Sequence, residues 1–274
     1  MNQLREYYER RELLSNLVLR ELRSRYKRSA LGWTWSLLNP LSSVLIYWVV
    51  FGVFLKVKAP IGDPSGQGNF VLFLLCALIP WNFFSNGVTQ SIESLVVNAG
   101  LIRKVYFPRE LLVASTIGGL LVTFLIELGV VITVLLIAGN MVLPWLPIVV
   151  LLVILQTLLV LGIGLLLSGA NVYFRDVRHF VNLLMPMLFY STPVVYPISY
   201  VPVNWQVAGR SIPLRSIYEM NPLVQLVSAY RALIYDLTFP SIGSLAYIAV
   251  WSIGLVLVGQ FVFNRLDHRL AEEV

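Results

Sequence analysis

Three cationic side chains, Arg25, Lys27 and Arg28, stand directly before the first long apolar run of the chain. The segment RYKRSALGWTWSLLNP (25–40) passes through a turn at Gly32 and then becomes apolar. Guanidinium and ammonium groups at this point lie at the depth of lipid headgroups, where they pair with phosphate oxygens. The residues therefore favour anion recognition at a membrane surface, and simple anchoring of the cytoplasmic side is the alternative.

A second charged segment, NAGLIRKVYFPRELL (98–112), mixes cations with aromatic residues and a proline. A loop that only keeps positive charge on one side of a membrane has no use for a Tyr-Phe-Pro sequence. Apolar side chains flanked by charge are typical of protein interfaces, so we expect this loop to dock a cytoplasmic protein. The residues expected to dock are Arg103, Lys104, Tyr106, Phe107, Pro108, Arg109 and Glu110.

The chain carries no motif for nucleotide, metal or hydrolytic chemistry. None of its lysines follows a glycine, which excludes the GxxxxGK(S/T) loop that binds nucleotide phosphates. Its two histidines are far apart and Cys76 is the single cysteine, so a zinc site is not expected. Neither GxSxG nor HExxH occurs. We expect no catalytic residue, cofactor or metal here, and transport would draw its energy from an ion gradient or a separate ATPase.

Composition indicates a membrane protein with several helical spans. Hydrophobic residues make up 58% of the 274 residues and charged residues 12%, about half the ~25% that is usual in soluble domains. Apolar runs reach the ~20 residues that a helix needs to cross the hydrocarbon core. We predict an all-α polytopic membrane protein, because helices satisfy their own backbone polar groups in lipid. Its six predicted spans are 35–55, 70–88, 111–138, 143–168, 180–200 and 242–263.

Lysine and arginine are distributed unevenly over the two sides of these spans. Residues 1–34 carry eight, the loop after the second span three, the loop after the fourth span two and the C-terminal tail two. The other side carries five of the twenty. Because positive charge marks the cytoplasmic side, we predict that both termini are cytoplasmic. The net charge of +6 then reflects topology and lipid contact, and does not argue for a nucleic-acid partner.

We divide the chain into an N-terminal helix, residues 1–30, and a single transmembrane domain, residues 31–274. Apolar residues recur at helical spacing over 3–28 while the opposite face is charged, which predicts an amphipathic helix at the membrane interface. This helix either anchors to headgroups alone or also docks a cytoplasmic protein. Residues 202–240 are too polar and proline-rich for a span, and Ile212–Ile234 predicts two short re-entrant helices. A surface cap is the alternative.

Aromatic residues gather in the first, second and fifth predicted spans. Sugar rings stack their C–H faces on aromatic planes, so such residues suit a conduit for a glycan, although they are also ordinary membrane-interface residues. The candidate conduit residues are Tyr47, Trp48, Phe84, Tyr190 and Tyr196.

One acid and two glycines stand out within the spans. Glu127 is the one charge deep in a predicted span, and such a group usually faces a bundle interior or water. No His, Lys or Arg lies within the spans to complete a proton relay, so a structural role is favoured. Gly162 and Gly164 predict close helix packing.

Several segments resemble the permeases of type-two ABC exporters that move cell-surface polysaccharides. RYKRSALGWTWSLLNP with LIYWVVFGVF (45–54) is similar to their start, and NAGLIRKVYFPREL to their first cytoplasmic loop, whose short coupling helix sits in the ATPase subunit. NVYFRDVRHFVNLLMP (171–186) resembles their second cytoplasmic loop and fifth span, and EMNPLVQLVSAYRALIY (219–235) their extracytoplasmic segment. The order is kept over nearly the whole chain. O-antigen permeases resemble it most, and teichoic acid, capsule and galactan exporters share the pattern.

The resemblance implies a homodimer in the bacterial inner membrane, with one ATP-hydrolysing subunit, which binds ATP and Mg²⁺, on each copy. It implies export of a glycan carried on a polyprenyl pyrophosphate, and re-entrant helices that close the outer end of the pore. It adds Arg175 and Asp176 to the residues that dock the ATPase subunit. The residues that would receive the lipid phosphates are Arg25, Lys27, Arg28 and Gly32.

Other functions are compatible with parts of the pattern. An efflux permease for teichoic acid, drugs or small lipids would share the topology. A membrane glycosyltransferase would need acidic residues grouped at one membrane face, whereas Glu93, Glu110, Asp176 and Asp267 stand singly. An ion-coupled carrier would need more buried polar groups than Glu127.

Overall fold

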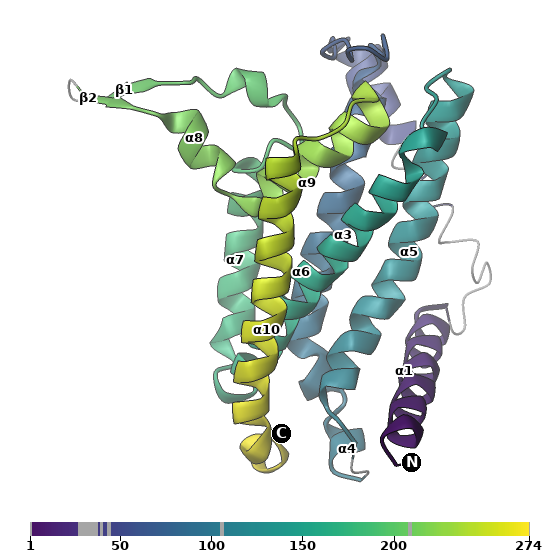
Figure 1. The fold of residues 1–274 in the computed structure, drawn as a ribbon, viewed down its shortest axis with the longest axis vertical. Coiled ribbons are helices and arrows are strands. Elements are labelled where there is room, and N and C mark those ends of the chain that lie inside the picture. The colour runs from purple at the N-terminus through teal and green to yellow at the C-terminus, as the bar shows by residue number, and fades with distance from the viewer. Residues whose placement is uncertain are drawn as a thin grey trace.

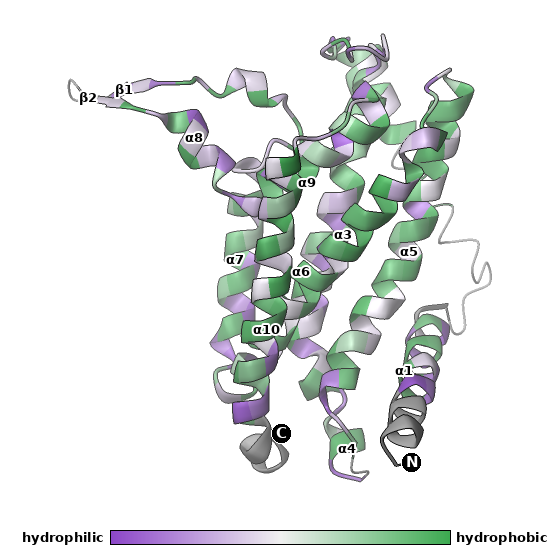
Figure 2. Cartoon of the chain, viewed as in Figure 1, coloured by the Kyte–Doolittle hydropathy of each residue, from purple (hydrophilic) through white to green (hydrophobic). Residues whose placement is uncertain are grey.

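The computed structural model is a bundle of helices with both termini at one end (Figure 1). It describes residues 2–26, 38, 41–42, 45–104, 107–207 and 210–273. Within these residues four helices are long and apolar enough to cross a membrane, and Figure 2 shows their apolar lengths. They are α3 (Phe70–Val97), α5 (Glu110–Ile137), α6 (Leu146–Tyr173) and α10 (Ile242–Glu273). The helical membrane class is confirmed, and these four helices coincide with the second, third, fourth and sixth predicted spans.

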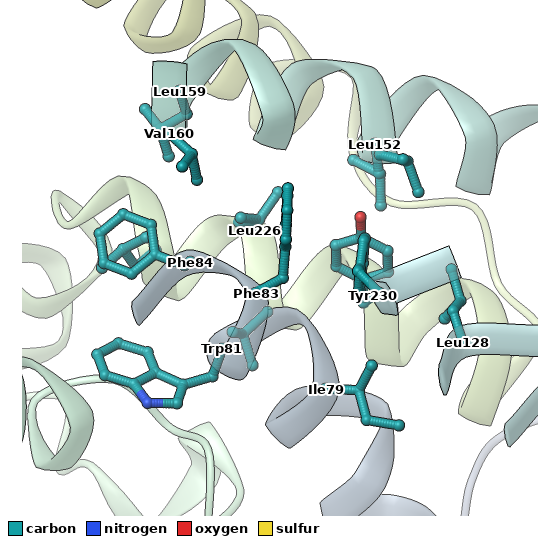
Figure 3. Close-up of a cluster of buried hydrophobic side chains, with 14 of the residues drawn as sticks. Ile79, Trp81, Phe83, Phe84, Leu128, Leu152, Leu159, Val160, Leu226 and Tyr230 are labelled. Carbon is teal, nitrogen blue, oxygen red and sulfur yellow. The ribbon is translucent and has the colours of Figure 1, made fainter. Parts of the chain in front are cut away.

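The centre of the bundle is α3, which contacts α5, α6, α7 and α9. Twenty of its 28 residues are buried. Phe83 stacks face to face on Phe124 of α5, with ring centroids 4.6 Å apart and planes 5° apart. Tyr230 and Leu152 close the same cluster from two further helices (Figure 3). Aromatic pairs of this kind add about 0.5–1.5 kcal/mol to the burial of their area, so α3 is firmly fixed.

Glycines bring the backbones of α6 and α10 into contact. A Cβ on Gly259 would lie 2.5 Å from the carbonyl oxygen of Gly162, and a Cβ on Gly162 would overlap the backbone at Leu255. A Cβ on Gly164 would lie 2.8 Å from Ser91 Oγ. Small residues let membrane helices approach this closely. The close packing predicted for Gly162 and Gly164 is therefore confirmed.

The N-terminal helix α1 (Asn2–Tyr26) packs along α5. It contains no proline or glycine, so nothing in its sequence interrupts the helix. Leu17 and Leu22 are buried, and a Cβ on Gly118 would lie 2.8 Å from Val18 Cγ2. The structure has the predicted helix as far as Tyr26, and part of its apolar face contacts α5 of the same chain; its place at the membrane interface stays a prediction.

The fifth predicted span differs from the structure. The helix α7 (Asp176–Tyr190) begins earlier than residue 180 and ends ten residues before residue 200. Fifteen residues rise only about 22 Å, which is short of the ~30 Å hydrocarbon core. The helix ends where Pro193 and Pro197 follow, because proline has no backbone N–H to continue it. A chain of turns and the short helix η4 (Ile198–Tyr200) take the place of the last helical turns.

The first predicted span, 35–55, lies largely outside the described residues. Its described end is an apolar helical segment, Leu45–Phe54, whose last part is the π-helix η2 (Trp48–Phe54). The short helix η3 (Leu143–Trp145) leads into α6. The structure does not confirm a total of six spans.

A group of short elements, which we call the cap, lies at the end of the bundle away from the termini (Figure 1). Its parts are β1 (Trp205–Val207), β2 (Arg210–Ile212), α8 (Leu214–Glu219), α9 (Pro222–Arg231) and the π-helix η5 (Ala232–Asp236). The antiparallel strands pair Trp205 with Ile212 and form a projecting hairpin. The two short helices predicted over Ile212–Ile234 correspond to α8 and α9, and the hairpin was not predicted.

Candidate functional site

The residues expected to dock a cytoplasmic protein lie at the end of the bundle that carries both termini (Figure 1). We call this the docking end: the short helix α4 (Ala99–Ile102), residues 103–104 and 107–110, and the junction of α6 with α7 at 174–176. Arg103, Lys104, Arg175 and Asp176 are exposed, and Pro108, Arg109 and Glu110 are half-buried. The structure therefore brings both predicted docking segments to one end.

Phe107 is half-buried and packs against the apolar core, so it anchors the docking loop as well as presenting an aromatic edge. Tyr106 lies outside the described residues.

A hydrogen bond joins α1 to the docking end. Arg20 Nη2 donates to Asn98 Oδ1 at 2.7 Å, and Asn98 Nδ2 donates to the Ser94 carbonyl oxygen at 2.8 Å. The carbonyl oxygen of Asn98 accepts from the backbone N–H groups of Leu101 and Ile102. Asn98 thus starts α4 and holds Arg20 at the same time.

The docking end is also tied to α3. Arg178 of α7 forms an ion pair with Glu93 of α3. Their contact lacks hydrogen-bond geometry, because Glu93 Oε1 has no directed donor in the described residues. Close by, Asn171 Nδ2 donates to the Ile92 carbonyl oxygen at 3.1 Å. Both ends of the α6–α7 turn therefore connect to the last turns of α3.

Of the cations predicted to receive lipid phosphates, only the backbone of Arg25 lies within the described residues. The helix α1 includes Arg25 in its backbone, while the side chain of Arg25 and the residues Lys27, Arg28 and Gly32 lie outside the described part. Their role stays a prediction.

Three of the five predicted conduit aromatics, Tyr47, Phe84 and Tyr190, belong to two separate chains of rings. Tyr47 stacks on Phe51 at 6.1 Å, and the contacts continue through Phe70 and Phe73 to Tyr235. Phe84 contacts Trp81 at 5.7 Å (Figure 3), and Trp81 leads through Phe189 to Tyr190. Tyr190 is 69% and Trp48 51% exposed, whereas Phe84 is buried. The structure does not gather the predicted set on one surface of a single chain.

An apolar groove of about 520 Å³ lies between α3, α6 and α7. Phe84 and Val88 form its floor on α3, and Asp176 marks its rim at the docking end. A groove with this lining suits hydrocarbon.

Tyr196 links the end of α7 to the cap. Its hydroxyl donates to the Tyr190 carbonyl oxygen at 2.6 Å and lies 2.5 Å from the hydroxyl of Tyr218. Burial raises the pKa of Tyr218, and its hydrogen bond with Tyr196 raises it further. The Tyr218 phenol therefore stays neutral and can donate to the Tyr196 hydroxyl, whose own proton is used on the Tyr190 carbonyl oxygen.

Arg231 is the most connected polar residue that the sequence did not single out. It is 6% exposed and donates to the carbonyl oxygens of Phe73, Pro193, Val194 and Tyr196. Its guanidinium carbon also lies 3.8 Å from the Phe73 ring centroid. One side chain thus joins α9, α3 and the turn after α7.

Tyr235 and Asp236 fix the cap to the loop before α3. The Tyr235 hydroxyl donates toward the carbonyl oxygens of Pro60 and Gln67, each at 2.9 Å. Burial raises the pKa of the Asp236 carboxyl to about 6, Arg231 opposes the rise and Asp63 adds to it.

Glu127 is half-buried on α5. No ion pair or hydrogen bond of its carboxyl group is found among the described residues, so the geometry supplies no relay partner.

The comparison with known families decides the class of this chain. The profile of the ABC-2 type transporter family matches residues 12–235, which include most of α1, the docking end and Arg231. The chain belongs to the ABC-2 type transporter family.

Curated relatives of this ABC-2 chain match it from end to end. It is 32% identical to the O-antigen export system permease protein RfbA of Klebsiella pneumoniae, over 95% of this chain and 94% of that protein. It is 31% identical to RfbA of Myxococcus xanthus, over 99% and 98%. It is 27% identical to the polysialic acid transport protein KpsM of Escherichia coli, over 93% of each chain.

Two connections of this ABC-2 chain escaped the sequence analysis. Arg20 and Asn98 are separated by 78 positions, and no local pattern pairs them. Arg231 was counted only among the charges of the outer side, although a cation between the apolar residues Tyr230 and Ala232–Ile234 marks a residue that needs buried partners.

Proposed function

We propose that the chain is the membrane-spanning subunit of an ATP-driven exporter that moves a polysaccharide across the bacterial cytoplasmic membrane. End-to-end similarity to three permeases named for O-antigen export or polysialic acid transport carries this proposal. The relatives are named for different polymers and match this chain over the same length, so sugar-polymer transport is their common property.

The energy source in this proposal is a separate ATPase subunit. The chain has no loop for nucleotide phosphates, whereas its docking end offers cations, Phe107 and a short helix between two long spans. Support also comes from Arg20, which holds α1 to the start of α4. ATP and Mg²⁺ are bound by the partner in this scheme, and two copies of each subunit form the complex.

A homodimer supplies the walls of the conduit. A single copy leaves apolar faces of α7 and α10 exposed, with Tyr190 at the outer end of α7. We propose that Tyr47, Trp48, Tyr190 and Tyr196 stack on sugars between the copies, and that Phe84 does so when α7 moves from the groove.

The glycan travels on a polyprenyl pyrophosphate in this proposal. Arg25, Lys27 and Arg28, with the turn at Gly32, receive the phosphates at the cytoplasmic opening. Both termini are cytoplasmic, because fifteen of the twenty lysines and arginines belong to that side and the termini lie at one end.

The deciding experiment is deletion of the gene in its host, followed by complementation. Loss of surface glycan with accumulation of lipid-linked glycan in the cytoplasmic leaflet supports the proposal, as does co-purification of an ATPase subunit. A host that keeps its surface glycan but becomes sensitive to drugs would instead identify an efflux permease. Arg103→Glu should abolish co-purification and Lys58→Glu, on the opposite side, should not.

A further inference from the structure

The helix α7 buries little of its own surface. Only Val181 and Met185 of its fifteen residues are buried, whereas α3 beside it buries twenty of 28. Phe180 and Leu183 are each 61% exposed. The position of α7 therefore depends strongly on the contacts at its two ends.

The inner contact is the Glu93–Arg178 ion pair, at the docking end. The side chains are 36% and 55% exposed, so water screens their attraction and the pair contributes little. Arg178 follows the predicted docking residues Arg175 and Asp176 within one helical turn. A protein that binds this turn competes directly with Glu93 for Arg178.

The outer contact is of a different kind. Arg231 is buried and donates to three carbonyl oxygens of the turn after α7, those of Pro193, Val194 and Tyr196. Prolines 193 and 197 leave this turn short of backbone donors, and an unpaired buried carbonyl group is strongly unfavourable. The guanidinium supplies the missing donors. Its contacts with the carbonyl oxygen and the ring of Phe73 also hold this turn against α3.

Free space lies beside α7. A groove of about 520 Å³ follows the chain from Phe174 to Leu188, although α7 also contacts α3 and α6 directly. Its lining is apolar except for Asp176 at the inner rim, so a shift of the rest of α7 over the groove exposes no charged group to hydrocarbon. The lining includes Val88, Ile163, Leu167, Val177, Leu184 and Leu188.

We propose that α7 turns about a fixed outer end at Arg231 and is released at its inner end when the ATPase subunit breaks the Glu93–Arg178 pair. Arg231 is then the pivot and Glu93–Arg178 the latch; both are positioning contacts that act on the conduit through α7. This inference rests on the proposed ATPase partner for its trigger, while the pivot and latch rest on the chain alone.

The test places pairs of spin labels on the full chain in lipid nanodiscs, with and without the ATPase subunit. Labels at Phe180 and Val97 follow the inner end of α7, and labels at Met187 and Ile154 follow its outer half; all four positions are exposed. We expect ATP to shift the inner distance by several Å and to leave the outer distance unchanged.

Variants of the latch give a sharper result. Glu93→Gln and Arg178→Gln should each shift the inner distance without nucleotide, and should raise glycan-independent ATP hydrolysis roughly 2–5-fold, the range for losing an exposed ion pair. Exchange of the two charges, Glu93→Arg with Arg178→Glu, should restore both readouts. Arg265→Gln removes a cation of the same side and should change neither.

The pivot is tested with Arg231→Gln, which should let the outer distance move with ATP. If that variant does not fold, Arg231→Lys, which keeps the charge but has fewer donors, should show the same effect in part. Equal movement of both ends in the unmodified chain would overturn the pivot, and failure of the exchanged charges to restore the inner distance would overturn the latch. Absence of any ATPase partner would refute the proposed function and the trigger, while the nucleotide-free distances would still decide the latch.

Discussion

Arg20 of α1 and Asn98 at the start of α4 are joined by a 2.7 Å hydrogen bond across 78 positions of sequence. The bond connects the N-terminal helix to the docking end, and α1 in turn rests on Gly118 and Gly119 of α5. The helix α1 therefore bridges the start of α4 and the first third of α5.

Removing this bond should weaken the response to the ATPase subunit. A typical hydrogen bond contributes about 0.5–1.5 kcal/mol, and exposure of Arg20 keeps its bond in this range, so Arg20→Ala should weaken the proposed ATPase binding or glycan export by roughly 2–10-fold. Asn98→Ala should match it, and the double variant should lose no more than either alone. The neighbouring Arg23→Ala, which removes an exposed cation of the same helix, is the control. Equal losses for Arg20→Ala and Arg23→Ala would show that charge alone matters.

The glycine contact between α1 and α5 predicts a specific steric rescue. Gly118→Ala places a Cβ 2.8 Å from Val18 Cγ2, and overpacking of this kind costs about 1–3 kcal/mol. Thermal unfolding in detergent should show the loss, and Val18→Ala should relieve it. Gly129→Ala lies on the same helix with nothing within 4 Å of the added Cβ, so it should be neutral or stabilising. A destabilised Gly129→Ala would mean that flexibility of α5 is the cause.

The crossing of α6 and α10 should tolerate no added atom. Gly162→Ala brings a Cβ onto the backbone at Leu255. A helix backbone cannot relieve such an overlap by a change of rotamer, as a side chain can. We expect poor folding yield and separation of the two helices, measured by protease sensitivity. Gly254→Ala on α10 adds a Cβ with nothing within 4 Å and should express normally. Normal folding of Gly162→Ala would place the crossing elsewhere.

The carboxyl of Asp236 should make the cap sensitive to pH. Burial raises its pKa from 3.8 to about 6, with Arg231 opposing and Asp63 adding to the rise. Since the folded state holds the proton more tightly, this contribution to stability is fully present below about pH 4 and is lost as pH rises through about 6. Melting temperatures from pH 4 to 7 should fall for the unmodified chain more than for Asp236→Asn. Parallel curves for the two would rule out Asp236 as the source.

Sequence predicted the long helices well and the ends of elements less well. The starts of α3, α5 and α10 coincide with predicted spans because Pro, Gly and charge interrupt the apolar runs there. The end of α7 at Tyr190 was missed because residues 191–200 carry no charge that would interrupt a span, and hydropathy does not register the missing N–H groups of Pro193 and Pro197. The hairpin was missed because strands of three residues show no periodicity.

The candidate site was predicted as segments and not as contacts. Most of the docking residues stand close together in the sequence, so their mixture of charged and aromatic types is visible without a structure. Arg20–Asn98, Glu93–Arg178 and the carbonyl oxygens around Arg231 pair residues from distant parts of the chain, and only tertiary packing determines such pairs.

The packing of α1 on α5 sets an order of events during synthesis. Val18 leaves the ribosome about 100 residues before Gly118, its partner in the fold, which is about 5–20 s at the usual rate of elongation. For that time the apolar stripe of the helix has no protein to cover it. We therefore expect the newborn helix to meet the bilayer surface first and to pack on α5 once the third apolar run has been inserted.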